Sequence, residues 1–334
     1  MTEPKPLRPE SQNTDGVAGL PVSFGVAFAP SAAASSSPVS AESGQLREGT
    51  DAVQPSRTTS RRRVRDLRVV AEQLGQRDWA ILHSVARWRF LTTDQIVRLH
   101  FHEHSLSSAP VIARRVLARL RRHRVLGALQ RPIGGKHAGS AHLVHYLDVI
   151  GDRLLREGNM RERRHRFYEP STTFLRHLLA IAETHTGLVS AERQGTLQLV
   201  RSDNEPHCWR SYNGIGGQPV TVKPDLYLET APSPQSPFLD TWFIEIDRGT
   251  EHLPTLLRKS RDYHDYYQSG VEQSRDGSFP LVVWLMAART RQRAQQRCEH
   301  LLAAIAADRT LNPNLFRVIE PEQLLPLIQK GAAL

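Results

Sequence analysis

The stretch APVIARRVLARLRRHRVLGALQRPIGGKHAGSAHLVHYL, residues 109–147, decides how the first part of the folded chain is organised. Its apolar residues recur at helical spacing up to Leu120, while its arginines lie mainly on other faces of the same helix. We expect this helix to end at Gly127. The segments ALQR and HLVHYL that follow are strand-like and flank a turn-rich PIGGKHAGSA, which predicts a β-hairpin. The stretch therefore predicts a basic helix followed by a hairpin.

Two shorter helical patterns precede this stretch. From Arg77 onward, apolar residues are spaced to build one helix face, and a second helix is capped by Thr92 or Thr93. A short helical segment, DVIGDRLLREG, follows the hairpin. Three helices, a hairpin and a short helix over residues 77–160 make the order of a winged helix-turn-helix, in which the third helix enters the DNA major groove.

Positive charge is concentrated in the same region. Residues 61–166 carry 23 Lys and Arg against 9 Asp and Glu, a net +14, whereas the segments on either side each carry a net −2. A local surplus of arginine suits the phosphate backbone and guanine edges of double-stranded DNA, the partner that we predict. The alternative is that the arginines form the solvated face of an ordinary helical bundle. The predicted DNA contacts are Arg114, Arg115, Arg119, Arg121, Arg122, Arg131 and Lys136.

The flanking segments differ in composition from this region. Residues 1–60 are rich in Ser, Ala, Pro and Gly, which predicts a disordered tail. Residues 61–76 are expected to form a basic arm and residues 161–170 a linker. Two cysteines make no disulfide framework, and no segment approaches the roughly 20 apolar residues of a membrane span, so we expect a cytoplasmic protein without membrane contact. The oligomeric state is left open.

The second half of the chain predicts an α/β fold. Its pattern is a helix, three strands, a helix, a strand, a further helix and a last strand over residues 171–330. That order predicts a mixed sheet with helices on both faces. The whole chain is therefore expected to be a multi-domain α/β protein. No Gly-rich phosphate loop of the Walker type appears in it, which argues against an ATP-driven motor.

Three carboxylates are placed suggestively on two of the predicted strands. Asp225 lies in VKPDLYLE, and Glu245 and Asp247 lie in WFIEID, where alternation puts both on one face of the strand. If the two strands pair, the three side chains converge. Carboxylate oxygens suit a hard cation, so we expect Mg²⁺ or Mn²⁺ at Asp225, Glu245 and Asp247. The alternative is a structural role in helix capping or arginine pairing.

These residues carry a family resemblance. Pro224-Asp225, followed twenty residues later by Glu245-x-Asp247, resembles the PD-(D/E)XK nuclease superfamily. More closely, KPDLYLE, then WFIEIDRGTE, then LRKSRDYHDYY behind a winged helix looks like the actinobacterial replication-relaxation family, over roughly residues 77–305. The resemblance implies a protein of a plasmid, integrative element or phage that acts on DNA during replication or transfer. Replication or conjugation proteins are its implied partners.

The chain departs from the nuclease pattern where Asp247 stands at the lysine position. In that superfamily the lysine helps to orient the attacking water and offset charge, and an aspartate has the wrong sign for this. Two lysines are candidates to replace it. Lys223 precedes Asp225 by two residues, so we expect the two side chains to share one strand face. Lys259 lies on the following helix, the position that the resemblance favours. The resulting catalytic set is Asp225, Glu245, Lys259 and Lys223.

Two functions remain open from the sequence. One is a metal-dependent nuclease that nicks or processes DNA; the other is a non-catalytic replication accessory factor or transcriptional regulator with a degenerate nuclease fold. Arg248 also has two predicted roles, because it either turns towards DNA or pairs with Glu251. On the first helix of the α/β domain, His177 and Glu183 are further candidates for a nuclease site.

Overall fold

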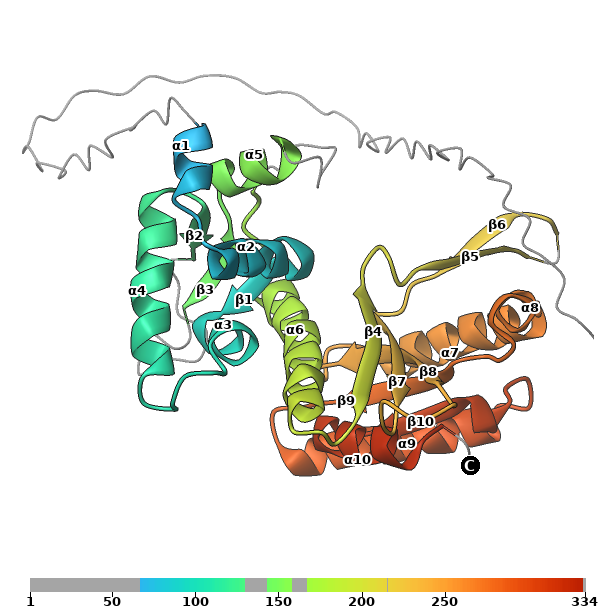
Figure 1. Ribbon diagram of the computed structural model, residues 1–334. Helices are drawn as coiled ribbons and strands as arrows, with labels where there is room; N and C mark the ends of the chain where they lie inside the picture. The colour runs from blue at the N-terminus through green and yellow to red at the C-terminus, as the bar shows by residue number, and fades with distance from the viewer. Residues whose placement is uncertain (1–66, 130–142, 158–166, 215, 333–334) are drawn as a thin grey trace, which may run out of the picture. The chain divides into compact units, whose positions relative to one another are not determined.

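The computed structural model describes residues 67–129, 143–157, 167–214 and 216–332 (Figure 1). We call residues 67–157 the helical module and residues 171–332 the α/β module. The predicted tail, the first part of the predicted arm and most of the linker lie outside the described residues, as do Arg131 and Lys136 of the hairpin. None of the helices within the described ranges is long and apolar enough to cross a membrane.

The helical module contains the predicted helices and the base of the hairpin, together with two elements that the sequence did not reveal. Its elements are α1 (Leu67–Glu72), α2 (Gln76–Trp88), β1 (Phe90–Thr92), α3 (Thr93–His100), α4 (Ala109–Arg122), β2 (Leu126–Ala128), β3 (Val144–Leu147) and α5 (Val149–Glu157). The strands form an antiparallel sheet in the order β1-β3-β2. Helix α1 lies in the predicted arm, where Leu67 and Val70 are buried.

Helix α3 begins at the predicted cap. The Thr92 side chain accepts a hydrogen bond from the Gln95 N–H at 3.1 Å, and the Gln95 side chain accepts one from the Thr92 N–H at 2.9 Å. This reciprocal pair satisfies two backbone donors that a helix start leaves open. The other candidate cap, Thr93, is buried and its hydroxyl contacts His145 Nε2 at 3.0 Å.

The predicted end of the basic helix at Gly127 is wrong. Helix α4 ends at Arg122, and Arg124 adopts a left-handed φ of 56° that a continuing helix does not allow. Gly127 lies in β2 instead, opposite Tyr146 of β3. A Cβ at this position would lie 2.3 Å from the Tyr146 ring, so the glycine permits a close approach of the ring rather than a helix stop.

The α/β module is built around a five-stranded mixed sheet, as predicted. Its elements are α6 (Thr172–Arg193), β4 (Gln198–Asn204), β5 (Arg210–Asn213), β6 (Pro219–Val222), β7 (Leu226–Ala231), β8 (Asp240–Asp247), α7 (Leu253–Gln268), α8 (Val271–Asp276), β9 (Leu281–Met286), α9 (Arg291–Ala307), η2 (Pro313–Leu315), β10 (Phe316–Ile319), η3 (Pro321–Gln323) and α10 (Leu324–Lys330). The sheet order is β10-β9-β8-β7-β4. Strands β8, β9 and β10 are parallel, whereas β7 and β4 are antiparallel to their neighbours.

The predicted strand VTVKPDLYLE is two strands. Residues 219–222 pair with β5 in a separate two-stranded hairpin, and residues 226–231 join the main sheet between β4 and β8. Pro224 lies in the break, where a residue without an N–H ends the strand ladder. Lys223 and Asp225 therefore do not share one strand face, which corrects the geometry expected for Lys223.

Helices cover both faces of the sheet, which confirms the predicted fold class. Side chains alternate along β8, so that Trp242, Ile244 and Ile246 belong to one core cluster with α6 and α10. Phe243 packs on the opposite face with Tyr227, Tyr263 and Tyr266, in the cluster that includes α7 and α9. Since Glu245 and Asp247 alternate with the isoleucines, they belong to the second face, at the carboxyl end of β8.

Candidate functional site

Asp225 and Glu245 lie close together at the carboxyl end of β8. Asp225 accepts a hydrogen bond from the Ile246 N–H at 2.7 Å, and its own N–H donates to the Ile244 carbonyl at 3.0 Å. These two bonds hold the Asp225 backbone and carboxylate against the strand that carries Glu245. Only 7% of Asp225 and 2% of Glu245 are exposed. The predicted convergence of these two carboxylates is therefore present in the structure.

Helix α7 supplies a lysine and a tyrosine to Glu245. Lys259 Nζ donates to Glu245 Oε2 at 3.3 Å and to Glu251 Oε1 at 3.0 Å, and the Tyr263 hydroxyl donates to Glu245 Oε1 at 2.7 Å. Burial and the nearby charge of Asp225 raise the pKa of Glu245 to about 8, against the opposing effect of Lys259. Burial disfavours charge on Lys259 too, but Glu245 and Glu251 outweigh it and raise its pKa.

Helix α6 places His177 on the other oxygen of Asp225. His177 Nε2 donates to Asp225 Oδ1 at 3.0 Å. Burial of the imidazole disfavours its charged form, but the hydrogen bond and the charge of Asp225 outweigh it and raise the pKa of His177. Glu183, further along α6, binds Gln95 and Arg98 of α3 instead. The site thus contains His177 and not Glu183.

Asp247 has structural contacts that occupy both of its oxygens. Its Oδ1 accepts hydrogen bonds from the N–H groups of Gly249, Thr250 and Glu251 at 3.1 to 3.2 Å, and its Oδ2 accepts from Arg297 Nε at 3.0 Å. The carboxylate therefore shapes the turn between β8 and α7, which is the structural alternative considered from the sequence. Within the described ranges, no group of three or more His, Cys, Asp or Glu side chains is arranged to hold a metal ion.

Lys223 approaches the same site from the hairpin. A cavity of about 180 Å³ is lined by Lys223, Glu245, Arg258, Lys259 and Asp262, with Thr221, Val222 and Tyr263. Lys223 Nζ itself lies 4.5 Å from the centre of the Trp209 ring. Both candidate lysines thus line the cavity that contains Glu245, but Lys259 is the one that donates a hydrogen bond to it.

Arg248 does not pair with Glu251, whose carboxylate binds Lys259. In the part of the chain that the structure describes, no acidic side chain forms an ion pair with Arg248. Burial and the positive charge of Arg176 lower the pKa of Arg248. Of the two predicted roles, pairing with Glu251 is therefore wrong.

The arginines of α4 fall into two groups. Arg114, Arg115 and Arg122 are exposed, whereas Arg121 is half-buried, which lowers its pKa. Arg119 donates to both oxygens of Asp78 at 2.7 and 2.6 Å and to the Gln73 carbonyl at 3.0 Å. Asp78 is buried in α2, so this ion pair joins α4 to α2. The structure thus gives Arg119 a contact inside the module that its sequence pattern did not reveal.

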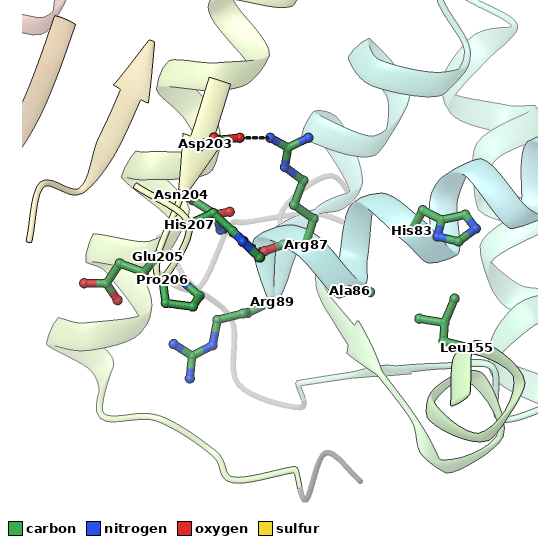
Figure 2. A pocket seen from close by; sticks show the side chains of 10 residues that line it. All are labelled: His83, Ala86, Arg87, Arg89, Leu155, Asp203, Asn204, Glu205, Pro206 and His207. Atoms are coloured by element: carbon green, nitrogen blue, oxygen red, sulfur yellow. Dashed lines mark hydrogen bonds and ion pairs between the residues drawn. The ribbon is translucent and has the colours of Figure 1, made fainter. Parts of the chain in front are cut away.

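A larger cavity, about 610 Å³, lies away from the carboxylates. Figure 2 shows its lining, in which the Arg87 guanidinium points to Asp203 at 3.2 Å while the Arg89 side chain extends in another direction. Arg87 belongs to α2 and Asp203 to β4, and Asn204 also donates to the Arg87 carbonyl at 2.8 Å. Charges of both signs line this cavity, together with His83 and His207. The charged groups of Arg87 and Asp203 in this cavity thus already pair with each other.

Comparison with known proteins assigns the chain to a family. No curated protein and no solved structure matches it. The family model described as replication-relaxation matches residues 82–282, a range that runs from α2 to β9 and includes Asp225, Glu245 and Lys259. The match covers more than half of the chain and agrees with the resemblance carried by its carboxylate motifs. The chain therefore belongs to the replication-relaxation family.

Proposed function

We propose that this protein acts in the replication or relaxation of plasmid or other mobile-element DNA, which it binds through the helical module and cuts at the carboxylate site of the α/β module. Family membership supports the first part of the proposal. The observation that carries the second part is the hydrogen bond from Lys259 Nζ to Glu245 Oε2, 3.3 Å long, beside Asp225. That arrangement provides an amine where the linear motif has Asp247.

DNA binding is supported by the element order and charge of the helical module. Helices α2, α3 and α4, together with the three-stranded antiparallel sheet, have the element order of a winged helix, and we assign α4 as its recognition helix. Arg115 and Arg122, seven residues apart, lie on one face of α4 and are exposed. In the described ranges neither guanidinium has an acidic partner. Their charge is thereby available to phosphates or base edges of double-stranded DNA.

A charge-reversal experiment tests this assignment. The Arg115→Glu/Arg122→Glu variant is compared with Arg293→Glu/Arg309→Glu, which makes the same change in net charge at exposed positions of the α/β module. Duplex binding is measured by fluorescence anisotropy at several salt concentrations. We expect the α4 variant to lose most of its affinity and the control to lose little, with a shallower salt dependence for the α4 variant. Equal losses in both variants would show that α4 is not the DNA-binding element.

We assign a hard divalent cation such as Mg²⁺ or Mn²⁺ to Asp225 and Glu245, and not to Asp247. Two neighbouring carboxylates, one with its pKa raised to about 8 by burial and by the other, form an acidic pair that a cation would stabilise in its charged form. Among the described residues, all three carboxylates accept hydrogen bonds on both oxygens, but Asp247 alone pairs with an arginine, Arg297, and also accepts from three N–H groups of the turn. When bound, the cation would activate water and offset charge on a phosphodiester.

The remaining side chains act around this pair. Lys259, with its pKa raised, stays protonated and stabilises negative charge that develops on a phosphate in the cavity. His177 orients Asp225 through its hydrogen bond, and Tyr263 orients Glu245. Lys223 and Arg258, which line the same cavity, add positive charge for a DNA strand.

Plasmid nicking tests the catalytic part. Supercoiled plasmid is incubated with the full chain and Mg²⁺ or Mn²⁺, and the conversion to open circles is followed. We expect activity from the wild type and from the control Glu299→Gln on the exposed side of α9, and none from Asp225→Asn or Lys259→Met. Nicking by Asp225→Asn at the wild-type rate would refute the assignment.

The second candidate function is a DNA-binding accessory factor or regulator without catalysis. It is favoured by Asp247 at the usual lysine position and by the contacts of Lys259 with Glu245 and Glu251, which occupy its amine. Calorimetric titration with Mn²⁺ separates the two functions. Carboxylate-dependent binding, lost in Asp225→Asn, supports the nuclease, and its absence from the wild type supports the accessory factor.

A further inference from the structure

Trp209 is held outward at the base of the β5–β6 hairpin. Trp209 is 38% exposed, whereas the residues on either side of it, Cys208 and Arg210, are 0% and 4% exposed. Single exposed aromatic residues are common on protein surfaces and carry no meaning by themselves. Two further observations, the anchoring of its neighbours and the position of Lys223, distinguish this one.

The neighbours of Trp209 prevent it from turning inward. Cys208 Sγ donates to the Pro224 carbonyl at 2.9 Å, and Arg210 Nε donates to Glu272 Oε1 at 3.1 Å. The Arg210 guanidinium also lies over the Tyr227 ring, 4.3 Å from its centre. Since the residues on both sides are buried and anchored by these bonds, Trp209 between them is held on the outer side. Its exposure is a property of the fold and not of a loose loop.

Lys223 links Trp209 to the carboxylate cavity. Arg210 pairs with Val222 at the end of the hairpin register, and Trp209 and Lys223 are the residues directly outside that pair. Lys223 Nζ lies 4.5 Å from the centre of the indole ring. The same lysine lines the cavity that contains Glu245 and Lys259. One side chain, Lys223, therefore contacts the outward aromatic ring and lines the cavity in which Arg258 and Lys259 lie beside Glu245 and Asp262.

We propose that Trp209 and Lys223 form a stacking subsite for an unpaired DNA base, next to the phosphate that lies at Glu245 and Lys259. The indole, 38% exposed with Lys223 Nζ over its ring, offers aromatic surface for a base of any identity, and the lysines follow the backbone of the same strand. A base within a duplex is already stacked on its neighbours and cannot reach the indole. The substrate class is accordingly a single-stranded or locally unpaired segment of DNA. This inference rests on the proposed function for the role of the adjacent cavity.

Binding to single strands in EDTA tests the subsite without any cleavage. Anisotropy is measured for the full chain with a labelled oligothymidine, with a duplex of equal length and with an abasic oligonucleotide that has the same number of phosphates. We expect Trp209→Ala to weaken oligothymidine binding about tenfold, and to leave duplex and abasic binding unchanged. Trp209→Phe keeps an aromatic face and should retain most of the affinity. Lys223→Ala should weaken binding to the oligothymidine and the abasic strand alike.

Phe238→Ala is the matched control, because Phe238 is 75% exposed on the β7–β8 connection and has no place in the subsite. It should bind all three oligonucleotides as the wild type does. The subsite is refuted if the wild type does not bind oligothymidine, if Trp209→Ala binds it normally, or if that variant loses duplex and abasic binding equally. A Trp209-dependent single-strand affinity in a protein that fails to nick plasmid would leave the subsite in place and remove the catalytic proposal. If the wild type nicks plasmid and Trp209→Ala binds oligothymidine normally, the catalytic proposal stands and the stacking subsite is refuted.

Discussion

Lys259 Nζ lies 3.3 Å from Glu245 Oε2, although the two residues belong to different elements, α7 and β8. The lysine of the nuclease pattern is expected two residues after this glutamate on the same strand, where Asp247 stands. Helix α7 thus provides the amine of Lys259, and the position on β8 where the pattern has a lysine holds Asp247, a carboxylate with structural contacts. Substitutions of Glu245 and Asp247 are therefore expected to have different effects.

Asp247→Asn is expected to destabilise the protein while leaving metal-dependent activity at the site. The asparagine still accepts the turn hydrogen bonds through its oxygen, but the buried charge pair with Arg297 is lost. Breaking such a pair costs about 3 kcal/mol. Urea unfolding measures the loss, and Mn²⁺ titration of the folded variant measures binding. Loss of Mn²⁺ binding with unchanged stability would show instead that Asp247 is a metal ligand.

Arg119→Ala is expected to lower the free energy of unfolding by about 1 to 3 kcal/mol, because it leaves the buried Asp78 carboxylate short of a partner. Arg115→Ala, on the same helix but exposed, should change stability by less than about 0.5 kcal/mol. A double-mutant cycle with Asp78→Ala measures the coupling between the two side chains. Additive effects in that cycle would contradict a stabilising ion pair.

Glu245→Gln is expected to stabilise the protein increasingly as the pH rises from about 4.5 to 8, in the absence of divalent ions. Burial and Asp225 raise the pKa of Glu245 to about 8, so in this window the unfolded chain loses a proton that the folded chain retains. The wild type therefore loses stability with rising pH, by up to about 1.4 kcal/mol per unit, and the glutamine variant lacks this term. Urea unfolding of both proteins in EDTA across the window gives the difference. Parallel stability curves would be evidence against the raised pKa.

Because of His185, we expect stability to depend on pH in the opposite sense under acidic conditions. Burial, with help from Arg87 and Arg193, lowers the pKa of His185 to about 3, and its ring stacks on Trp88 at 4.3 Å. Below pH 6.5 the unfolded chain takes up a proton that the folded chain does not, so stability falls as the pH decreases towards 3. His185→Gln should lose less stability than the wild type between pH 7 and pH 5. Thermal unfolding at several pH values measures this, and an unchanged difference between the two proteins would rule out the effect.

Local patterns were sufficient for the elements that bury one regular face. The apolar spacing of α2, α3 and α4 and the alternation of β8 are written in neighbouring residues, so the predicted helices and the common face of Glu245 and Asp247 are present in the structure. Short elements were missed for a physical reason. β1 and α1 contain three and six residues and are stabilised by pairing with β3 and by burial, which no local periodicity records.

The sequence by itself determined the fold class, the basic character of the helical module and the pair Asp225 and Glu245, because these depend on composition, periodicity and residue type. Only the tertiary structure decided which partner each charged group has. Lys259 reaches Glu245, Arg297 takes Asp247, Arg119 takes Asp78 and His177 takes Asp225. Each of these contacts joins separate elements, and the free energy of burying a charge depends on where a counter-charge lies in space rather than on its distance along the chain.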